Sequence, residues 1–251
     1  MKKLILFIFM FMALGVKAEQ HKIIKEIIAN ANSCVPLYYF SKSQINSKTN
    51  YKFYSEALKD FTKNKNFYLT KDSNLMPVSN CILRANRNYY KNIKTLNENF
   101  RVTTVINTDL LIKNLVENKV QKKSTINELY FPMSSSEYPK VQSAKSFIEI
   151  LKSLSQATPQ NRAIITCFFG KHRTGLISAS YQFLLEYAQN KEKACKEIAT
   201  EKDKAYQQML NIAKIGLLIY DMPDSFKEFY KDFAKSVCEE NSKEFLNSLL
   251  N

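Results

Sequence analysis

Short apolar runs alternate along the chain with longer segments whose apolar residues recur at helical spacing. The β-branched runs predict strands at residues 102–106, 129–133 and 163–166, of which 129–133 is the weakest. Helical spacing predicts helices at residues 22–31, 54–63, 141–154, 174–187, 194–217 and 226–250. Strands that alternate with helices indicate an α/β fold with a central, largely parallel sheet flanked by helices. The first and last helices are expected to form N- and C-terminal helical extensions of this fold.

The first 18 residues have the pattern of a secretory signal peptide. Met1-Lys2-Lys3 precedes an apolar run over residues 4–14, and Gly15-Val16-Lys17-Ala18 supplies a small-residue cleavage site. An apolar run of about 11 residues is too short to cross a bilayer, which takes about 20 residues. We therefore expect cleavage after Ala18 and a periplasmic or secreted protein, with no transmembrane segment after signal removal.

The composition is that of an ordinary globular protein, with 45% hydrophobic and 24% charged residues among 251. Only two histidines occur, His21 and His172, which leaves too few imidazoles for zinc sites that need several of them. The net charge is +14, or +11 after loss of the three lysines in residues 1–18. Such a charge attracts anionic partners, but no aromatic-interleaved basic motif occurs, so nucleic acid is not an expected partner.

Five cysteines occur, at positions 34, 81, 167, 195 and 238. In an exported protein an odd number leaves one thiol over, so two disulfides and one free cysteine are expected. The sequence does not fix the pairing among Cys34, Cys81, Cys195 and Cys238, although Cys195 and Cys238 are possible partners.

The segment Ile164–Gly175 is the most informative part of the chain. Only three glycines follow the signal segment, and two of them, Gly170 and Gly175, lie here. A chain this poor in glycine is expected to keep it where the backbone takes positive φ or approaches a ligand closely. The apolar run predicts a strand and residues from Thr174 onward predict a helix, so the loop between them would gather amide groups beside a helix N-terminus. Such an arrangement binds anions.

Cys167 at the start of this loop and Arg173 six positions later suggest phosphate chemistry. The loop amides, the helix dipole and the guanidinium would favour the thiolate, which is the nucleophilic form of cysteine. Arg173 would bind two phosphate oxygens with its planar group, and Thr174 would donate its hydroxyl to the sulfur. The product would be a phosphocysteine that water hydrolyses. The residues expected to bind the substrate phosphate are Phe168, Phe169, Gly170, Lys171, His172 and Arg173.

This loop resembles the Cys-x5-Arg signature of the cysteine-dependent protein tyrosine phosphatase superfamily, and of its branches most the dual-specificity type. The string Gly170–Gly175 is especially similar to the atypical plant and fungal dual-specificity phosphatases. Upstream, residues 80–85 resemble the Leu-Tyr-Arg-Ser strand of that fold, residues 104–107 its Thr-Val-Ile-Asn strand, and residues 130–134 the stretch before its acid loop. The resemblance implies a phosphatase core at residues 66–190, preceded by an extension at 19–65 and followed by packed helices at 191–251.

The chain departs from the family pattern at three places. Thr166 stands where most members have histidine before the nucleophile. A threonine hydroxyl would replace part of the hydrogen-bond support that this histidine gives to the thiolate. Phe168 and Phe169 make the loop apolar, which favours a flat aromatic leaving group. The family's general acid is an aspartate about 30 residues before the cysteine, where this chain offers Glu137. We expect Glu137 to protonate the leaving group, with His172 as a further candidate.

Three basic residues are candidates for additional phosphate contacts. Lys171 would add charge for a substrate with more than one phosphate, or would lie in solvent at the rim of the loop. Arg84 and Arg87 could serve in the same way from an earlier strand, but a surface position is the expectation for both.

The sequence therefore predicts an exported phosphatase that hydrolyses phosphate monoesters through Cys167, with no metal and no cofactor. Phosphorylated proteins and phosphorylated inositol compounds both remain open as substrates. One alternative is a phosphate-binding pseudophosphatase or interaction module that lacks a competent acid. Another is a redox or arsenate-reducing enzyme, which needs a second thiol near Cys167; Cys195 is the nearest in sequence.

Overall fold

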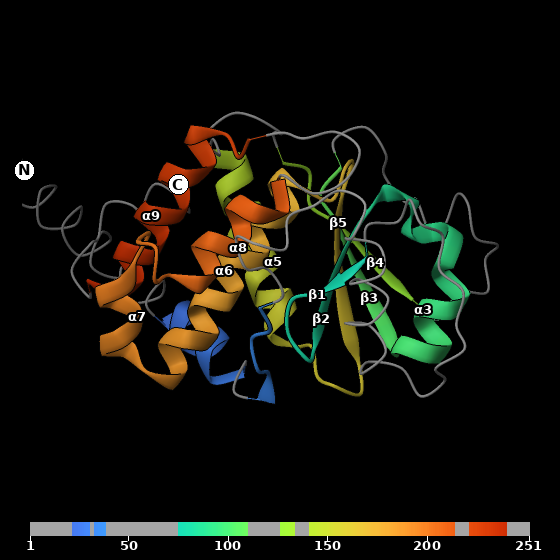
Figure 1. Cartoon of the computed structure of the whole chain (residues 1–251). Coiled ribbons are helices and arrows are strands. Elements are labelled where there is room, and N and C mark those ends of the chain that lie inside the picture. Colours follow the sequence, from blue (N-terminus) through green and yellow to red (C-terminus); the bar gives the residue numbers. More distant parts are fainter. Residues whose placement is uncertain are drawn as a thin grey trace, which may run out of the picture.

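The computed structural model describes residues 22–30, 33–38, 75–109, 126–133, 141–213 and 221–239, of which 22–30 form a helix. In chain order the further elements (Figure 1) are β1 (Met76–Pro77), β2 (Ile82–Asn86), the 3-10 helix η4 (Arg87–Asn92), α3 (Ile93–Phe100), β3 (Val102–Asn107), β4 (Asn127–Tyr130), α5 (Val141–Ser155), β5 (Arg162–Cys167), α6 (His172–Gln189), α7 (Lys191–Glu197), α8 (Lys204–Ala213) and α9 (Asp224–Cys238). The signal segment 1–18, the predicted helix 54–63 and residues 240–250 of the last predicted helix lie outside the described residues.

The described strands form one sheet in the order β1-β2-β5-β3-β4. Strands β2, β5, β3 and β4 are parallel to one another, and the edge strand β1 is antiparallel to β2. The register pairs Cys167 with Asn86 of β2, and Thr166 with Asn107 of β3. The carboxyl ends of three strands therefore meet at one edge of the sheet, which is where open α/β sheets bind ligands. The predicted α/β class with a largely parallel sheet is confirmed.

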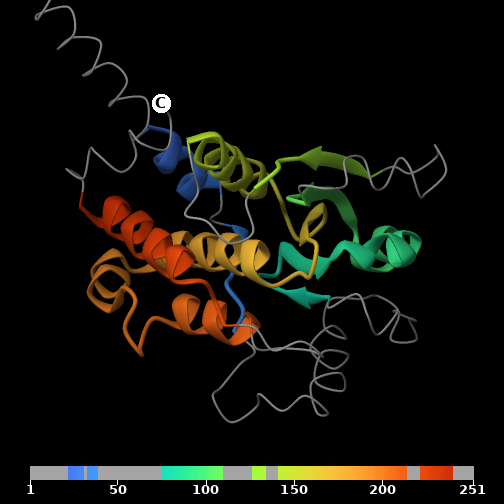
Figure 2. The same ribbon diagram turned by 90° about the horizontal axis from the view of Figure 1, so that it is seen from above.

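Side chains of the central strand β5 alternate between the two faces of the sheet, as a strand buried on both sides requires. Ala163 and Ile165 belong to the larger core cluster, together with residues of α5, α6, α8 and α9. Ile164 belongs to the smaller cluster, which lies under η4 and α3. Figures 1 and 2 show the two helical layers on opposite sides of the sheet. Ile24 and Ile27 place the helix 22–30 in the larger cluster.

Helix α6 is the central helix of the larger layer. It contacts the sheet through β5 and is surrounded by α5, α7, α8 and α9. Residues 173–185 are consequently buried around the whole circumference of the helix. The helix begins at His172, so its first turn also carries Arg173 and Thr174.

The segment 194–217 is predicted as helical; its described part, residues 194–213, is divided between α7 and α8, and residues 214–217 lie outside the described residues. Ala199 adopts a left-handed conformation with φ of 53°. The Asp203 carboxylate accepts hydrogen bonds from the amides of Ala199 and Tyr206, each at 2.8 Å, and from the hydroxyl of Tyr230. The break contains no glycine or proline that would indicate it in the sequence. The side chain of Asp203 caps the new helix instead.

Residues 87–100 form η4 and α3, where the apolar pattern predicts no element. Ile93, Leu96 and Phe100 are buried at helical spacing, but the asparagines between them weaken the pattern. Arg101 ends α3 in the left-handed region, with φ of 56°. Strand β4 covers residues 127–130 rather than the predicted 129–133.

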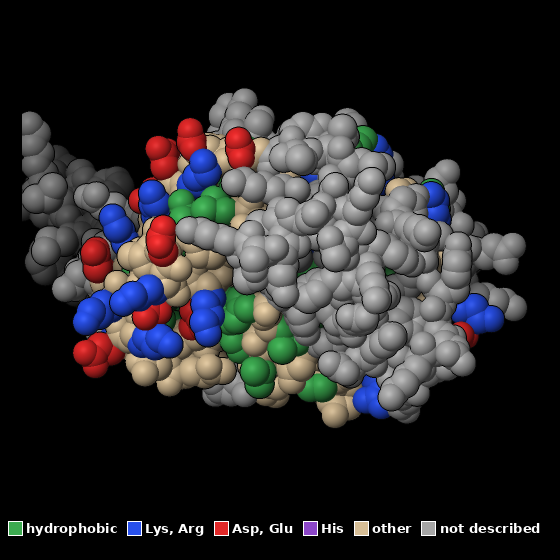
Figure 3. Space-filling model, in the orientation of Figure 1, with side chains coloured by type: hydrophobic (Ala, Val, Ile, Leu, Met, Phe, Trp, Pro, Cys, Tyr) green, Lys and Arg blue, Asp and Glu red, His purple; other side chains and the backbone are tan. Residues whose placement is uncertain are grey.

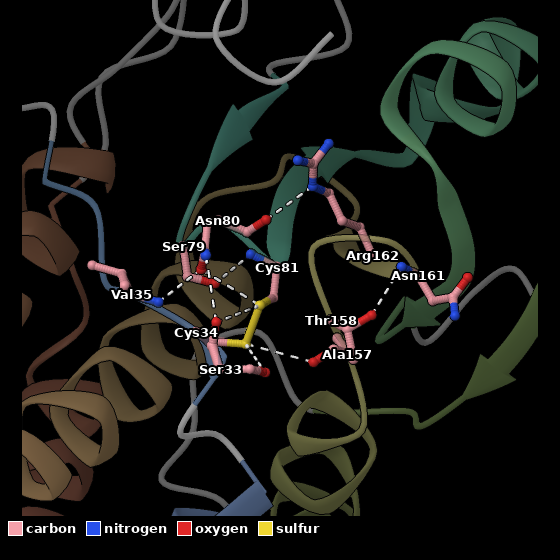
Figure 4. Close-up of a disulfide and its surroundings, with 10 residues drawn as sticks. All are labelled: Ser33, Cys34, Val35, Ser79, Asn80, Cys81, Ala157, Thr158, Asn161 and Arg162. Atoms are coloured by element: carbon pink, nitrogen blue, oxygen red, sulfur yellow. Dashed lines mark hydrogen bonds between the residues drawn. A yellow bond between two sulfur atoms is a disulfide. The ribbon is translucent and has the colours of Figure 1, made fainter. Parts of the chain in front are cut away.

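Two disulfides fix the periphery of the fold. Cys34–Cys81 joins the segment before the sheet to the start of β2 (Figure 4), and Cys195–Cys238 joins α7 to α9. Around the first disulfide, the amide of Val35 donates to the side chain of Asn80 at 2.7 Å. The structure thus supplies the pairing that the sequence left open, and the expected two disulfides are confirmed.

The surface over α7 and α9 carries both signs of charge. Figure 3 shows Lys and Arg side chains interspersed with Asp and Glu on the described part of this face. The excess of positive charge is therefore not gathered there into a patch of one sign. Among the described helices, none has the length and apolarity that a membrane span requires.

Candidate active site

Cys167 is the last residue of β5 and lies at the centre of the carboxyl edge of the sheet. Its side chain is 2% exposed. All five cysteines are among the described residues, and Cys167 alone is free. This thiol is therefore the one cysteine sulfur available for chemistry, as expected for one leftover cysteine.

The Cys-x5-Arg loop, residues 167–173, joins β5 to the first turn of α6. The hydroxyl of Thr174 donates to Sγ of Cys167 at 2.9 Å. The first amides of a helix have no acceptor within the helix, so those of α6 point their donors toward the loop side. A positive helix end and a hydroxyl donor beside the sulfur both stabilise negative charge there.

Arg173, the last residue of this loop, is buried and is held by two main-chain carbonyl groups. Its Nη1 donates to the oxygen of Thr108 and, at 3.2 Å, to the oxygen of Met133. Thr108 follows β3 and Met133 follows β4. Both hydrogens of Nη1 have partners, so a planar anion would use the edge formed by Nε and Nη2.

Gly170 has φ of 66°, as predicted for a glycine in this loop. A Cβ atom built on Gly170 would lie 2.6 Å from the amide nitrogen of Asn86 and 2.7 Å from the carbonyl oxygen of Ala85. The amide of Arg87 donates to the oxygen of Phe168 at 3.4 Å. The loop therefore rests directly on the main chain at the end of β2.

Arg84 is not a surface residue, and the expectation that placed it there was wrong. Its side chain is 1% exposed, and Nη1 donates to the carbonyl oxygen of Gly170 at 2.7 Å. The sequence shows that a strand residue is charged but not which loop covers it, so the burial of Arg84 could not be read from the sequence.

Lys171 is buried, not solvated at the rim of the loop. Burial lowers the pKa of its ammonium group, and the positive charge of Arg84 lowers the pKa further. His172 is half-buried, with its Nε2 atom inside the protein. A cluster of basic groups therefore lies at this loop.

Two aromatic side chains form the outer wall of the loop. The guanidinium of Arg87 lies 3.2 Å from the ring centre of Phe168, and the rings of Phe168 and Phe169 are 4.4 Å apart. Phe169 is 44% exposed, one of two large apolar side chains that are exposed among the described residues. Arg87 is half-buried and holds Phe168 in place by a cation–π contact.

The other residues proposed from sequence lie elsewhere. The hydroxyl of Thr166 donates to the carbonyl oxygen of Cys167 at 3.5 Å and not to its sulfur, because consecutive strand residues face opposite sides. Glu137 lies outside the described residues. Glu128 accepts hydrogen bonds from Asn107 and Tyr89. These bonds give the Glu128 carboxylate a structural role.

Cys195 is bonded to Cys238 and so offers no thiol to Cys167. The redox alternative loses the second thiol that it required. Within the described ranges, no three His, Cys, Asp or Glu side chains gather in a group suited to a metal ion. Sequence reasoning missed the carbonyl oxygens that hold Arg173, since main-chain acceptors leave no signal in residue types.

No protein-family model matches the chain. No curated protein matches it. Among solved structures it is similar to TpbA of P. aeruginosa, with 15% identity and a TM-score of 0.41 over 68% of this chain and 94% of that chain. A cysteine-to-serine variant of TpbA in complex with pTyr gives 17% identity and a TM-score of 0.36 over 59% and 86%. At these TM-scores the likeness carries no functional conclusion. The functional conclusion rests on the geometry of the site.

Proposed function

We propose that this protein is an exported cysteine-dependent phosphatase of the protein tyrosine phosphatase superfamily, of the dual-specificity type. The observation that carries the proposal is the free thiol of Cys167, bonded by Thr174 at the positive end of α6 and followed by the buried Arg173. Two disulfides and the signal-like segment 1–18 support export, because disulfides form in oxidising compartments.

The reaction has two steps. The Cys167 thiolate attacks phosphorus, the S–P bond forms, and the bond to the leaving-group oxygen breaks as that oxygen takes a proton from Glu137. Water then attacks the phosphocysteine, the S–P bond breaks, and Thr174 donates a hydrogen bond to the departing thiolate. Arg173 binds the equatorial oxygens through Nε and Nη2, since Nη1 already has its partners.

We propose the same domain boundaries that the sequence predicts. Residues 66–190 would form the phosphatase core, the extension 19–65 would precede it, and residues 191–251 would cover it as packed helices. The contacts of α7, α8 and α9 with α6 support this arrangement.

Turnover without metal tests the function. Wild-type protein is assayed in chelator against p-nitrophenyl phosphate, a phosphotyrosine peptide, a phosphoserine peptide and a phosphorylated inositol. We expect phosphate release, inhibition by vanadate and transient labelling of Cys167 by substrate phosphorus. Phosphate binding with no turnover on any substrate would instead identify an interaction module.

Arg173→Lys is expected to lower kcat/KM on an aryl phosphate by roughly 10²-fold. Lysine keeps the charge but has no planar pair of donors, so one nitrogen must serve the carbonyls of Thr108 and Met133 and also the phosphate. Steady-state kinetics measure the loss. Arg101→Lys is the control, because Arg101 ends α3 away from the loop and its substitution should leave kcat/KM within about 2-fold. Equal kinetics for the two variants would contradict the assignment.

The aromatic wall of the loop supports a preference for aryl phosphates. We expect Phe169→Ala to lower kcat/KM for a phosphotyrosine peptide by roughly 5- to 10-fold, since a stacked aromatic pair contributes about 0.5–1.5 kcal/mol beyond its buried area. A phosphoserine peptide should lose less than 2-fold. Equal losses on both peptides would show that Phe169 acts on the loop and not on the leaving group.

A further inference from the structure

Arg87 lies at the outer wall of the Cys-x5-Arg loop, against Phe168. It is the first residue of η4 and directly follows Asn86, which pairs with Cys167 in the register of β2 and β5. The amide of Arg87 donates to the carbonyl oxygen of Phe168, and its guanidinium carbon lies 3.2 Å from the centre of the Phe168 ring. Both contacts fix the guanidinium beside the residue that follows the nucleophile.

The stacking contact uses one face of the guanidinium and none of its N–H groups. An arginine carries all of its N–H donors in the plane of the group, so a ring against one face leaves the edges able to donate. Within the described ranges, no acceptor and no carboxylate pairs with the side chain of Arg87. The residue is half-buried, so part of the group is accessible to solvent. A fixed, planar set of donors therefore lies beside the mouth of the proposed site.

The position of Arg87 indicates which part of a substrate it can reach. The rings of Phe168 and Phe169 are 4.4 Å apart, so Arg87, Phe168 and Phe169 form one continuous wall. Phe169 is the exposed member of this wall, which we expect to contact an aromatic leaving group. A leaving group at Phe169 is separated from Arg87 by one ring. Arg87 can therefore meet a group that flanks the aromatic ring of the substrate.

A carboxylate is the group that fits these donors best. It is planar and accepts two parallel hydrogen bonds from a guanidinium, which adds directional selectivity to the attraction of opposite charges. Stacking on Phe168 also holds the guanidinium before the substrate arrives, so less side-chain entropy is lost on binding.

We propose that Arg87 selects phosphotyrosine substrates that carry a carboxylate side chain next to the phosphotyrosine, by binding this carboxylate with its in-plane N–H groups. The inference rests on the proposed function, because it names the substrate class of the same site. The loop binds the phosphate and Phe169 contacts the aromatic ring, whereas Arg87 recognises the neighbouring acidic side chain. A phosphorylated inositol has neither an aromatic ring nor a carboxylate and is the contrasting substrate.

The test measures a selectivity ratio. This is kcat/KM for a phosphotyrosine peptide with glutamate beside the phosphotyrosine, divided by kcat/KM for the same peptide with glutamine there. An effect on the loop itself changes both values alike and cancels in the ratio. The variants are Arg87→Gln and Arg87→Lys. Lys94→Gln is the matched control, because it removes the same charge from an exposed position on α3.

We expect a ratio of roughly 5 for the wild type, as for an accessible ion pair, and of about 1 for Arg87→Gln. Arg87→Lys should give about 2, because lysine keeps the charge but lacks the planar pair of donors. Lys94→Gln should stay within about 1.5-fold of the wild-type ratio. Salt at about 0.5 M should lower the wild-type ratio toward 1 and leave that of Arg87→Gln unchanged, since ions screen an accessible pair.

A wild-type ratio near 1 overturns the proposal. A ratio that Arg87→Gln leaves unchanged, or that Lys94→Gln lowers equally, overturns it as well. If Arg87→Gln does not fold, Arg87→Lys decides: an unchanged ratio overturns the proposal and a lowered one supports it. A larger loss in Arg87→Gln on a bisphosphorylated inositol than on the acidic peptide also overturns it, because the second anion would then be a phosphate.

The failure of the phosphatase function gives a different result. Wild-type protein that binds the two peptides without turnover removes the enzymatic function alone. The ratio of the two Kd values, measured by calorimetry, then replaces the ratio of kcat/KM values, with the same outcomes for each variant. Wild-type protein that binds neither peptide removes both proposals.

Discussion

Cys167→Ser is expected to lower kcat on every phosphorylated substrate by roughly 10³-fold or more while leaving the fold intact. A serine hydroxyl is not ionised near neutral pH, so the nucleophile is lost although the size of the side chain hardly changes. The oxygen can still accept the hydrogen bond from Thr174. Phosphate binding should therefore survive within about 3-fold, and the unfolding temperature should change by less than about 3 °C. Kinetics, calorimetry with a phosphorylated aryl ligand and thermal unfolding measure the three quantities.

The control for this variant is Cys195→Ser combined with Cys238→Ser, which removes the α7–α9 disulfide. It should lose about 2–4 kcal/mol of stability and keep kcat, because these sulfurs lie away from the loop. Activity that persists in Cys167→Ser would show that the reaction does not pass through this thiol. Activity lost only in the double variant would show that the active fold depends on the α7–α9 disulfide and not on the Cys167 thiol.

Gly170→Ala is expected to lower kcat/KM by roughly 10²-fold and the free energy of unfolding by more than about 2 kcal/mol. The left-handed conformation of Gly170 costs an L-residue about 1–2 kcal/mol. The new methyl group would also meet main-chain atoms of Ala85 and Asn86 at 2.6–2.7 Å, and neither can rotate away. The loop must then leave the end of β2, and a displacement of about 1 Å costs about 10²-fold in rate.

Gly175→Ala is the matched control for this prediction. Gly175 lies within α6, and a methyl group there would meet the Cε atom of Met222 at 3.0 Å, the mobile end of a flexible side chain. Alanine also favours a helix by about 1 kcal/mol over glycine. The variant should keep kcat/KM within about 3-fold and stability within about 1 kcal/mol. If Gly170→Ala is equally mild in denaturant unfolding and kinetics, the contact with β2 does not position the loop.

The arrangement of the loop could be predicted from the sequence because it is local. Cys167, Gly170, Arg173 and Thr174 are close in the chain, and a strand followed by a helix fixes their relation. Strands were also predictable at residues 102–106 and 163–166, since β-branched residues make up most of each run. The predicted boundaries of helices were wrong where a side chain caps the helix, as Asp203 does before α8.

What surrounds the loop could not be predicted, because it comes from strands distant in sequence. Arg84 precedes Gly170 by 86 residues and meets it only through the pairing of β2 with β5. The carbonyl groups that hold Arg173 come from Thr108 and Met133, which are 65 and 40 residues away. Such contacts follow from the register of the strands and not from residue type. The sequence shows only that Arg84 is charged, and its charge alone predicted a surface position.

The position of the Cys34–Cys81 disulfide bears on how the chain matures. Cys81 directly precedes β2, whereas Cys167 pairs with Asn86 at the other end of that strand. A strand of five residues separates the two sulfurs by roughly 15 Å, well beyond the reach of thiol–disulfide exchange. Once β2 and β5 have paired, Cys167 cannot exchange with this cystine, so scrambled bonds between Cys167 and Cys34 or Cys81 can arise only before the two strands pair.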